Sequence, residues 1–313
     1  MSQSQILYLF TRTPLHVGAG ASVGAIDQPI VRERHTGFPV IPASGLKGTF
    51  ADAWNDELIA DGTKKVRVKA TKKGEQTVFE TSPAAWLFGS DDPNHSFAGS
   101  LQFSEAKLLA FPIRSAKGSF AWITCPLMLQ RAARDGVIPS ALIAGLEEPV
   151  EENAIFDCGA SSKLDLSGKI VLEEYTFSSV QWQGLAKLGD HMATLVGSDS
   201  IWGEVATRLV ILSNGMMSFF AQNACEVAQH VRISDETGTA EGGALFNQEN
   251  VPSETLFYAV LHFMAGRGSS TGAKTPEQAQ AAFSNKIKDQ VFQFGGDAST
   301  GLGYCTVAMM NPV

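Results

Sequence analysis

The stretch from Pro14 to Phe50, PLHVGAGASVGAIDQPIVRERHTGFPVIPASGLKGTF, decides more about this 313-residue chain than any other segment. Glycine recurs along it, and glycine is used where the backbone needs unusual dihedral angles or must approach a ligand closely. The last part predicts a helix over about 45–59, because Ser44 is a good N-cap and apolar residues follow at helical spacing (Leu46, Phe50, Ala53, Trp54 and Leu58). The segment is therefore a long glycine-rich excursion that ends in an amphipathic helix.

Lys47 falls in the first turn of that predicted helix, where the helix dipole disfavours a cation. The position makes sense if an anion lies between the lysine and the free backbone N–H groups, and phosphate is the common case. A solvated lysine on a short helix, at a cost of roughly a few tenths of a kcal/mol, explains it as well. From these residues alone both interpretations stay open.

The rest of the chain alternates between strand and helix patterns. Strands are expected over 6–13, 101–111, 119–129, 171–177, 255–264 and 304–310, and helices over 182–196 and 216–224. Another helix starts at Thr275, because threonine at the N-cap, Pro276 at the first position and Gln278 at the third form a capping pattern. This order suits an α+β fold with a ferredoxin-like (RRM-like) core that carries long insertions.

No shift in composition marks a domain boundary, so we expect one domain over residues 1–313 with three insertions. Residues 61–80 predict a mobile loop or hairpin, and within them 64–73 hold six cations and no acid. Residues 147–162 are acidic and irregular, and residues 231–250 are polar and interrupted by glycine between two apolar runs. Long insertions are unusual in compact domains and tend to be functional.

Composition describes a globular chain with ample core, since 44% of the residues are hydrophobic and the net charge is −8. No run of about 18 apolar residues occurs, and MSQSQILYLF lacks the basic region of a secretory signal, so we expect no membrane segment. The four cysteines are scattered without a CxxC pair, which fits reduced thiols in the cytoplasm and disfavours a cysteine zinc site. Negative charge argues against nucleic-acid binding, yet residues 1–50 hold four cations against two acids, so one basic side is compatible with RNA.

Asp27 is an isolated carboxylate in the glycine-flanked stretch, with His16 before it and Arg32 and Arg34 after it. An aspartate in a loop commonly makes a local hydrogen bond, which is the plain interpretation here. A histidine titrates near neutral pH and can act as acid or base, although a histidine that caps the end of a strand is as ordinary. No HExxH, GxSxG or Walker pattern occurs, which disfavours zinc proteases, serine hydrolases and P-loop enzymes.

A second glycine-rich segment, GGDASTGLGY at 295–304, lies near the end of the chain. Gly296, Gly301 and Gly303 could wrap a phosphate with backbone N–H groups, as glycine nests do. The same letters also describe an ordinary turn, so the segment is a weak signal by itself.

Taken together, these segments resemble the RAMP superfamily of CRISPR proteins, and most closely the repeating backbone subunit of type III-B (Cmr) effector complexes. The resemblance runs through LHVGAG, VGAIDQPIVRERHTGFPVIPASGLKG, WLFGS at 86–90, AGSLQFSEAKLLAFPIRS at 98–115, WITCP at 122–126, VLEEYTF at 171–177, VPSETLFYA at 251–259 and FGGDASTGLGY at 294–304. It therefore spans nearly the whole chain in the same order. Two departures concern the helix start: Ala43 and Gly45 stand where the related type III-A subunits usually have Gly and Ser, and no arginine follows Lys47 one turn later.

The resemblance implies a thumb-like β-hairpin that protrudes from the core, which we place within 231–250. A thumb that wedges between base pairs needs apolar side chains, and Leu245 and Phe246 are the candidates, with simple hairpin packing as the alternative. The resemblance also implies an RNA grip that involves Arg32, Arg34, Ser44, Lys47, Gly48, Gly296, Gly301 and Gly303.

By the same resemblance, Asp27 matches the aspartate that cleaves target RNA in type III backbone subunits, with His16 as a second acid–base candidate. The implied activity is that of a metal-dependent endoribonuclease within an assembled complex. The RNA 2′-OH attacks the adjacent phosphate and leaves a 2′,3′-cyclic phosphate and a 5′-OH end, which requires in-line geometry and a proton acceptor. One carboxylate cannot build a metal cage, so Mg²⁺ would be held mainly by RNA phosphates and water, without a site of protein ligands alone.

The implied partners are a guide RNA, a target RNA, copies of the chain itself in a filament, and other type III-B effector subunits, all in the cytoplasm and away from membranes. Three alternatives stay open: a filament subunit that does not cleave, a type III-A-like backbone subunit, and an enzyme that uses the same loops on a small phosphate ligand.

Overall fold

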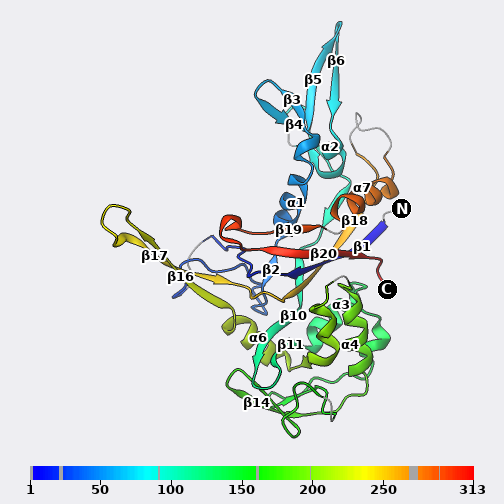
Figure 1. Ribbon diagram of the computed structural model, residues 1–313. Helices are drawn as coiled ribbons and strands as arrows, with labels where there is room; N and C mark the ends of the chain where they lie inside the picture. The colour runs from blue at the N-terminus through cyan, green and yellow to red at the C-terminus, as the bar shows by residue number, and fades with distance from the viewer. Residues whose placement is uncertain are drawn as a thin grey trace.

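The computed structural model describes residues 3–20, 24–90, 92–159, 162–197, 199–267, 274–288 and 290–313. Within them, seven α-helices and a large mixed sheet form a mixed α/β protein (Figure 1). The centre of the sheet has the order β10 (Ala106–Ser115), β18 (Leu256–Phe263), β1 (Gln3–Thr11) and β20 (Tyr304–Met310), and each strand is antiparallel to its neighbours. Helix α1 (Ala43–Asp52) follows β1 along the chain, and α7 (Pro276–Ile287) follows β18.

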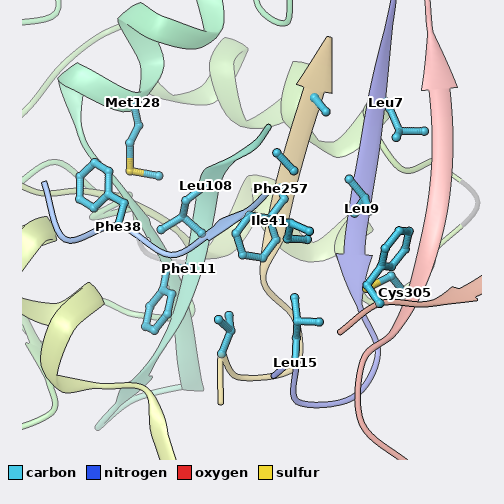
Figure 2. Packing of buried hydrophobic residues seen from close by; sticks show 14 of the residues in the cluster. Leu7, Leu9, Leu15, Phe38, Ile41, Leu108, Phe111, Met128, Phe257 and Cys305 are labelled. Atoms are coloured by element: carbon cyan, nitrogen blue, oxygen red, sulfur yellow. The ribbon is translucent and has the colours of Figure 1, made fainter. Parts of the chain in front are cut away.

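Strand β1 is buried on both faces, which explains why its sequence is a continuous apolar run rather than an alternating one. Leu7 and Leu9 belong to one hydrophobic cluster, which also holds buried residues of α1 and α7. Tyr8 and Phe10 belong to the other, with buried residues of α3 (Pro126–Arg134) and α4 (Leu185–Thr194). Figure 2 shows Leu7 and Leu9 of β1 and Phe257 of β18 within the first cluster.

Helix α1 begins earlier than predicted, because Pro42 and not Ser44 caps it. The extended ψ of 144° at Pro42 sets the entry of the chain, and the carbonyl of Pro42 accepts the hydrogen bond of Leu46 N at 3.1 Å. The helix ends at Asp52 and a short 3₁₀ segment, Asn55–Glu57, follows. Lys47 is therefore the fifth helical residue, at the start of the second turn. The predicted apolar face is confirmed at Leu46 and Phe50, which are buried, whereas Trp54 is buried but lies beyond the end of the helix.

Several predicted strands are pairs of elements. The run 101–111 contains β9 (Leu101–Phe103) before β10, and the run 119–129 is β11 (Ser119–Thr124) followed by α3, which starts at a proline. The run 171–177 spans β13 (Lys169–Leu172) and β14 (Tyr175–Ser179), because the chain turns at Glu173, whose φ is +50°. The capping pattern at α7 is confirmed: Thr275 Oγ1 accepts from Gln278 N, and Gln278 Oε1 accepts from Thr275 N.

The remaining elements, in chain order, are β2 (Val40–Ile41), α2 (Pro83–Phe88), β7 (Gly89–Ser90), β8 (Phe97–Ala98), the 3₁₀ turn Ser140–Ile143, β12 (Asn153–Ala154), the 3₁₀ turn Trp202–Glu204, α5 (Val205–Arg208), β15 (Leu209–Ile211), α6 (Asn214–Asn223), β19 (Val291–Gln293) and the 3₁₀ turn Ala298–Thr300. None of the helices in the described ranges is long and apolar enough to cross a membrane.

The three expected insertions take different forms. Residues 61–80 belong to two hairpins, β3 (Ile59–Asp61) with β4 (Lys64–Val66), and β5 (Val68–Lys73) with β6 (Gln76–Thr81). Residues 147–162 are irregular apart from β12, while 160 and 161 lie outside the described residues. The third insertion is the hairpin of β16 (Glu226–Ile233) and β17 (Ala240–Asn250), which starts five residues before the predicted 231. The β5–β6 and β16–β17 hairpins project from the body in different directions (Figure 1).

Candidate nucleic-acid interface

The loop that carries Asp27, residues 24–37 (the Asp27 loop), lies along the base of β17. Gln28 forms a parallel bridge with Gln248 of β17. Its N–H donates to the carbonyl of Asn247 at 3.1 Å, and its carbonyl accepts from Glu249 N at 2.9 Å. The loop therefore adds a short third segment to the hairpin where the hairpin meets the body of the protein. These bonds hold Asp27 beside the base of the hairpin.

Asp27 is exposed and bonded to one residue of the hairpin. Its Oδ2 accepts from the backbone N–H of Asn247 at 2.9 Å, and its own N–H donates to Asn247 Oδ1 at 2.7 Å. The hydrogen bonds are thus long-range, unlike the local turn bond that is the common use of a loop aspartate. Asp27 Oδ1 has no hydrogen-bond partner among the described residues, so one carboxylate oxygen faces solvent and is available to a ligand.

His16 follows β1 and is only 7% exposed. Its Nδ1 lies 2.7 Å from the carbonyl oxygen of Glu249, so that nitrogen carries a proton and donates it. The other nitrogen, Nε2, faces Gly18, where an added Cβ would lie 2.9 Å from it. His16 and Asp27 thus contact β17 at positions two residues apart, and His16 links the end of β1 to the hairpin. This geometry fits the strand-end interpretation, and a catalytic role of His16 stays a prediction.

The predicted RNA ligand Arg32 is used inside the protein. Its guanidinium contacts Glu249 Oε1 at 2.5 Å and Cys225 Sγ at 3.3 Å, and it donates to the carbonyls of Gly37 and Ala221 at 2.7 Å each. The carboxylate of Glu249 is only 5% exposed and the Arg32 side chain 18%, so the pair is an internal fastening. Burial raises the pKa of the Cys225 thiol to about 12, which keeps it protonated at neutral pH. RNA binding by Arg32 stays a prediction that this geometry does not favour.

A second ion pair fastens the Asp27 loop to α3. Arg131 Nη1 lies 2.9 and 3.1 Å from the two carboxylate oxygens of Glu33, and Thr36 Oγ1 donates to Glu33 Oε2 at 2.6 Å. Although burial opposes ionisation of Glu33, the bonds from Thr36 and Arg131 outweigh it and hold the pKa of the carboxyl below its ordinary value. Arg34, by contrast, is exposed and has no hydrogen bond or ion pair within the described part of the chain, so it is open to a phosphate.

The predicted phosphate grip lies on one solvent face of α1. Ser44, Lys47 and Gly48 are all exposed, and their spacing places them side by side on the helix. Lys47 makes no ion pair or hydrogen bond with any described residue. Lys47 and Arg67 both line a hollow of about 290 Å³, here called the basic hollow. Arg67 is the residue between β4 and β5. Sequence reasoning included Arg67 only as one member of the basic run 64–73, because nothing in the chain indicates that the hairpin base returns to α1.

The C-terminal glycine loop does not form the predicted N–H nest. The N–H groups of Gly296, Gly301 and Gly303 donate to the carbonyls of His16, Ala298 and Pro14 at 2.8–3.1 Å. The loop instead turns carbonyls inward, toward Gln293 Nε2, which lies 3.1–3.3 Å from the oxygens of Phe294, Gly295, Gly296 and Leu302. Two of these N–H groups bond to residues that follow β1 and the third bonds within the loop, which favours the ordinary turn over a nest; RNA contact by Gly296, Gly301 and Gly303 stays a prediction.

The two apolar candidates on the hairpin differ. Leu245 is 66% exposed and is therefore open to a partner. Phe246 stacks on His230 of β16, with ring centroids 5.1 Å apart. Leu245 therefore has the geometry expected of a wedge, whereas the ring of Phe246 already has a partner within the hairpin.

A metal ion finds no protein cage in the described residues, since no group of three or more His, Cys, Asp and Glu side chains converges there. The free Oδ1 of Asp27 fits one position of a hard cation such as Mg²⁺, with phosphate oxygens and water as the other ligands.

The chain is similar to known proteins along nearly its whole length. The CRISPR system Cmr endoribonuclease Cmr4 of Pyrococcus furiosus is 29% identical over 310 residues, which cover 98% of this chain and 96% of that protein. A crystal structure of oligomeric Cmr4 from Pyrococcus furiosus superposes with a TM-score of 0.67 at 22% identity and covers 98% of both chains. A chain of the type III-B Cmr-beta complex bound to cognate target RNA superposes with a TM-score of 0.65 at 18% identity, over 99% of this chain and 97% of that one.

A family model described as the RAMP superfamily matches residues 9–306. The match covers the Asp27 loop, the start of α1 and the whole of β10 and β18, together with the end of β1 and the beginning of β20. The chain therefore belongs to the RAMP superfamily.

Proposed function

We propose that this chain is the repeating backbone subunit of a type III-B CRISPR effector complex, which binds guide RNA and cleaves complementary target RNA at regular intervals. Similarity to the Cmr4 endoribonuclease along nearly the whole chain supports the proposal. So does the shared fold with a chain of a type III-B complex bound to target RNA. The observation that carries the cleavage activity is Asp27: an exposed carboxylate, held at the base of a projecting hairpin, with one oxygen free.

The proposed RNA grip is the exposed face of α1 with the basic hollow beside it. Lys47 and Arg67 would each neutralise a phosphate of the guide, and Arg34 on the Asp27 loop adds a further free cation. Because these contacts reach phosphates and not bases, sequence selection would come from base pairing between guide and target.

The β16–β17 hairpin is proposed as the thumb, with the exposed Leu245 as the side chain that enters the duplex. The order β20–β1–β18–β10, with α1 after β1 and α7 after β18, supports the expected ferredoxin-like core. In this arrangement the thumb would interrupt the duplex directly beside Asp27, since the Asp27 loop is bonded to the base of the same hairpin.

The proposed chemistry is intramolecular. The 2′-oxygen of the target forms a bond to the adjacent phosphorus while the bond from phosphorus to the 5′-oxygen breaks. The proton of the 2′-OH passes to Asp27, and the departing 5′-oxygen takes a proton from water, which leaves a 2′,3′-cyclic phosphate and a 5′-OH. Mg²⁺, held mainly by RNA phosphates and water, would supply stabilisation of the negative charge that develops on the phosphate oxygens.

Copies of the chain would assemble into a filament along one guide RNA, together with other type III-B subunits. The solved relative that is described as oligomeric supports self-assembly. The four cysteines are free thiols, and those at 125, 225 and 305 are held protonated by burial, which agrees with a place in the reducing cytoplasm.

The test is to purify the complex with its guide and supply a matching labelled target RNA. Fragments at regular spacing with cyclic phosphate ends are expected from the wild type, and none from an Asp27→Asn complex that still binds guide and target. Binding without cutting by the wild type would identify a non-cleaving filament subunit. Failure to bind long RNA in a salt-sensitive manner would favour an enzyme for a small phosphate ligand.

A further inference from the structure

We propose that Asn247 is a positioning residue for cleavage, which holds the Asp27 carboxylate in place and ties it to the β16–β17 hairpin. This inference rests on the proposed catalytic role of Asp27. Asn247 lies on β17, close to the point where the hairpin joins the body, and 220 positions away from Asp27 in the chain. No motif in the surrounding sequence indicates a functional role for this asparagine.

Four hydrogen bonds join Asn247 to the Asp27 loop through different atoms, one of them the bond from Gln28 N–H to its carbonyl at 3.1 Å. Its backbone N–H holds Asp27 Oδ2 at 2.9 Å, which fixes the orientation of the carboxylate. Its side-chain Oδ1 accepts from Asp27 N at 2.7 Å, and its Nδ2 donates to the carbonyl of Ala25 at 3.0 Å. The amide therefore grips the backbone on both sides of Ile26, while the main chain of the same residue holds the carboxylate.

The grip matters because this part of the loop has little else to hold it. Gly24, Ala25 and Asp27 are exposed, so apolar packing does not fix them. Further along, Ile30 is buried and its N–H donates to the buried carboxylate of Glu249 at 3.1 Å, so the loop is secure from there onward. Asn247 thus holds the end of the loop next to the exposed turn. It bonds directly to Asp27, whose carboxylate oxygen must reach the RNA.

The remaining oxygen of Asp27 is left free by this arrangement. Because Oδ2 is occupied by Asn247 N, only Oδ1 can accept a proton or bind a cation without breaking a bond. Removing the side chain of Asn247 would keep the main-chain bonds to Asp27 Oδ2 and Gln28 N but release the N–H of Asp27 and the carbonyl of Ala25. The carboxylate would then sample positions about 1 Å away, and a displacement of that size can cost about 100-fold in rate.

The experiment compares Asn247→Ala with Gln229→Ala in the assembled complex. Gln229 lies opposite Asn247 on β16, is exposed, and has no side-chain hydrogen bond to the described residues of the Asp27 loop. It therefore controls for loss of a polar side chain on the same rung of the hairpin. Under single turnover, Asn247→Ala should cut about 10- to 100-fold more slowly at unchanged positions, with target affinity within about twofold of wild type. Gln229→Ala should cut like the wild type.

Hydrogen exchange on the full chain without RNA supplies a readout that does not depend on activity. The segment 24–31 should exchange faster in Asn247→Ala than in wild type or Gln229→Ala, because the acceptor of Asp27 N is lost. If both the cleavage rate and this exchange match the wild type, the inference is overturned while the proposed function stands. If the rate and the target affinity fall together, Asn247 serves hairpin structure and the positioning role is overturned. If the wild-type complex binds its target but never cuts it, the proposed function and this inference fall together.

Discussion

The Asp27 loop and the basic hollow present the same kinds of side chain but use them in opposite ways. In the loop, Arg32 and Glu33 are each bonded to several groups of the protein, and both ion pairs are largely buried. Around the hollow, Lys47 has no partner in the described structure and Arg67 has a single 3.3 Å bond to a carbonyl. The difference teaches that cations near a predicted RNA site divide into those that build the site and those that are left over to bind. Only the second group can be expected to change RNA affinity.

The largest effect is expected at Asp27, the carboxylate of the loop that keeps one oxygen free of protein partners. Asp27→Asn should lower the rate of target cleavage by about 10³-fold, because the amide cannot accept a proton. Guide binding and assembly should stay near wild type, since the side chain is exposed and opens no core. Quantified cleavage of a labelled target measures this. A target with a 2′-deoxy substitution at the attacking nucleotide should resist the wild-type complex equally, and cutting of that target would refute the intramolecular route.

Arg32→Ala tests the fastened side of the comparison. Removing one partner of a buried ion pair leaves Glu249 uncompensated, so the free energy of unfolding should fall by about 3 kcal/mol. Urea unfolding of the isolated chain measures the change. Arg34→Ala is the matched control, because Arg34 is exposed and unpaired within the described residues, and its stability should not change. Equal, small losses in the two variants would show that Arg32 is not an internal fastening.

Lys47→Glu tests the open side. Guide RNA affinity should fall by about tenfold at physiological salt, and the slope of log affinity against log salt should decrease by about 1. The unfolding free energy should stay within about 0.5 kcal/mol of wild type, as for other exposed substitutions away from special features. Fluorescence anisotropy of a labelled guide at several salt concentrations gives both quantities. An unchanged salt slope would remove Lys47 from the grip.

Glu33→Gln sharpens the comparison through pH. Because the pKa of Glu33 is lowered in the folded state, its ionised form stabilises the protein above the ordinary carboxyl range, and that stabilisation fades as pH falls through the lowered value. The variant should lose about 1.5 kcal/mol near pH 7. At pH 3.5 the gap to wild type should narrow, which urea unfolding at the two pH values will show. A gap that is constant with pH would mean that Arg131 and Thr36 do not favour the charged form.

The smallest effect is expected at the β5 hairpin and its neighbour β4. Neutralising Lys64, Lys65, Lys72 and Lys73 with serine should weaken guide binding by about threefold, because these exposed lysines lie outward from the basic hollow and act at long range. Substitution is preferable to deletion of 64–73, since those residues include both strands. The anisotropy titration used for Lys47 applies here, and an unaltered affinity would confine the grip to α1 and Arg67.

Local sequence rules predicted much of the fold. The start of α7, the last strand and the apolar face of α1 follow from spacing and capping residues, all of which act over a few positions. The predicted start of α1 is too late, because Pro42 occupies the N-cap position two residues before Ser44. The turn within 171–177 could not be predicted, because Glu173 adopts a positive φ and glutamate is not a residue type that indicates one.

The candidate site was predictable only in part. Asp27 and Lys47 could be chosen from the chain by resemblance and by helix position, and both are exposed in the structure. The side chains that hold Asp27 in place could not, because Asn247 and Glu249 lie more than 200 positions away and contact the loop only after folding. Arg32 is the opposite case. Its charge suggested contact with RNA, but in the structure its guanidinium bonds to Glu249 and Cys225.

The position of β1 has a consequence for how the protein is made. Its two neighbours are β18 and β20, and its register joins Gln3 to Phe263 and Ile6 to Met310. A ribosome that adds about 5–20 residues per second needs roughly 15–60 s between the first of these strands and the last. During that interval an apolar strand, later buried on both faces, has no edge to pair with. The sheet can close only after β20 has been synthesised, so the nascent chain is a natural client for chaperones until that strand emerges.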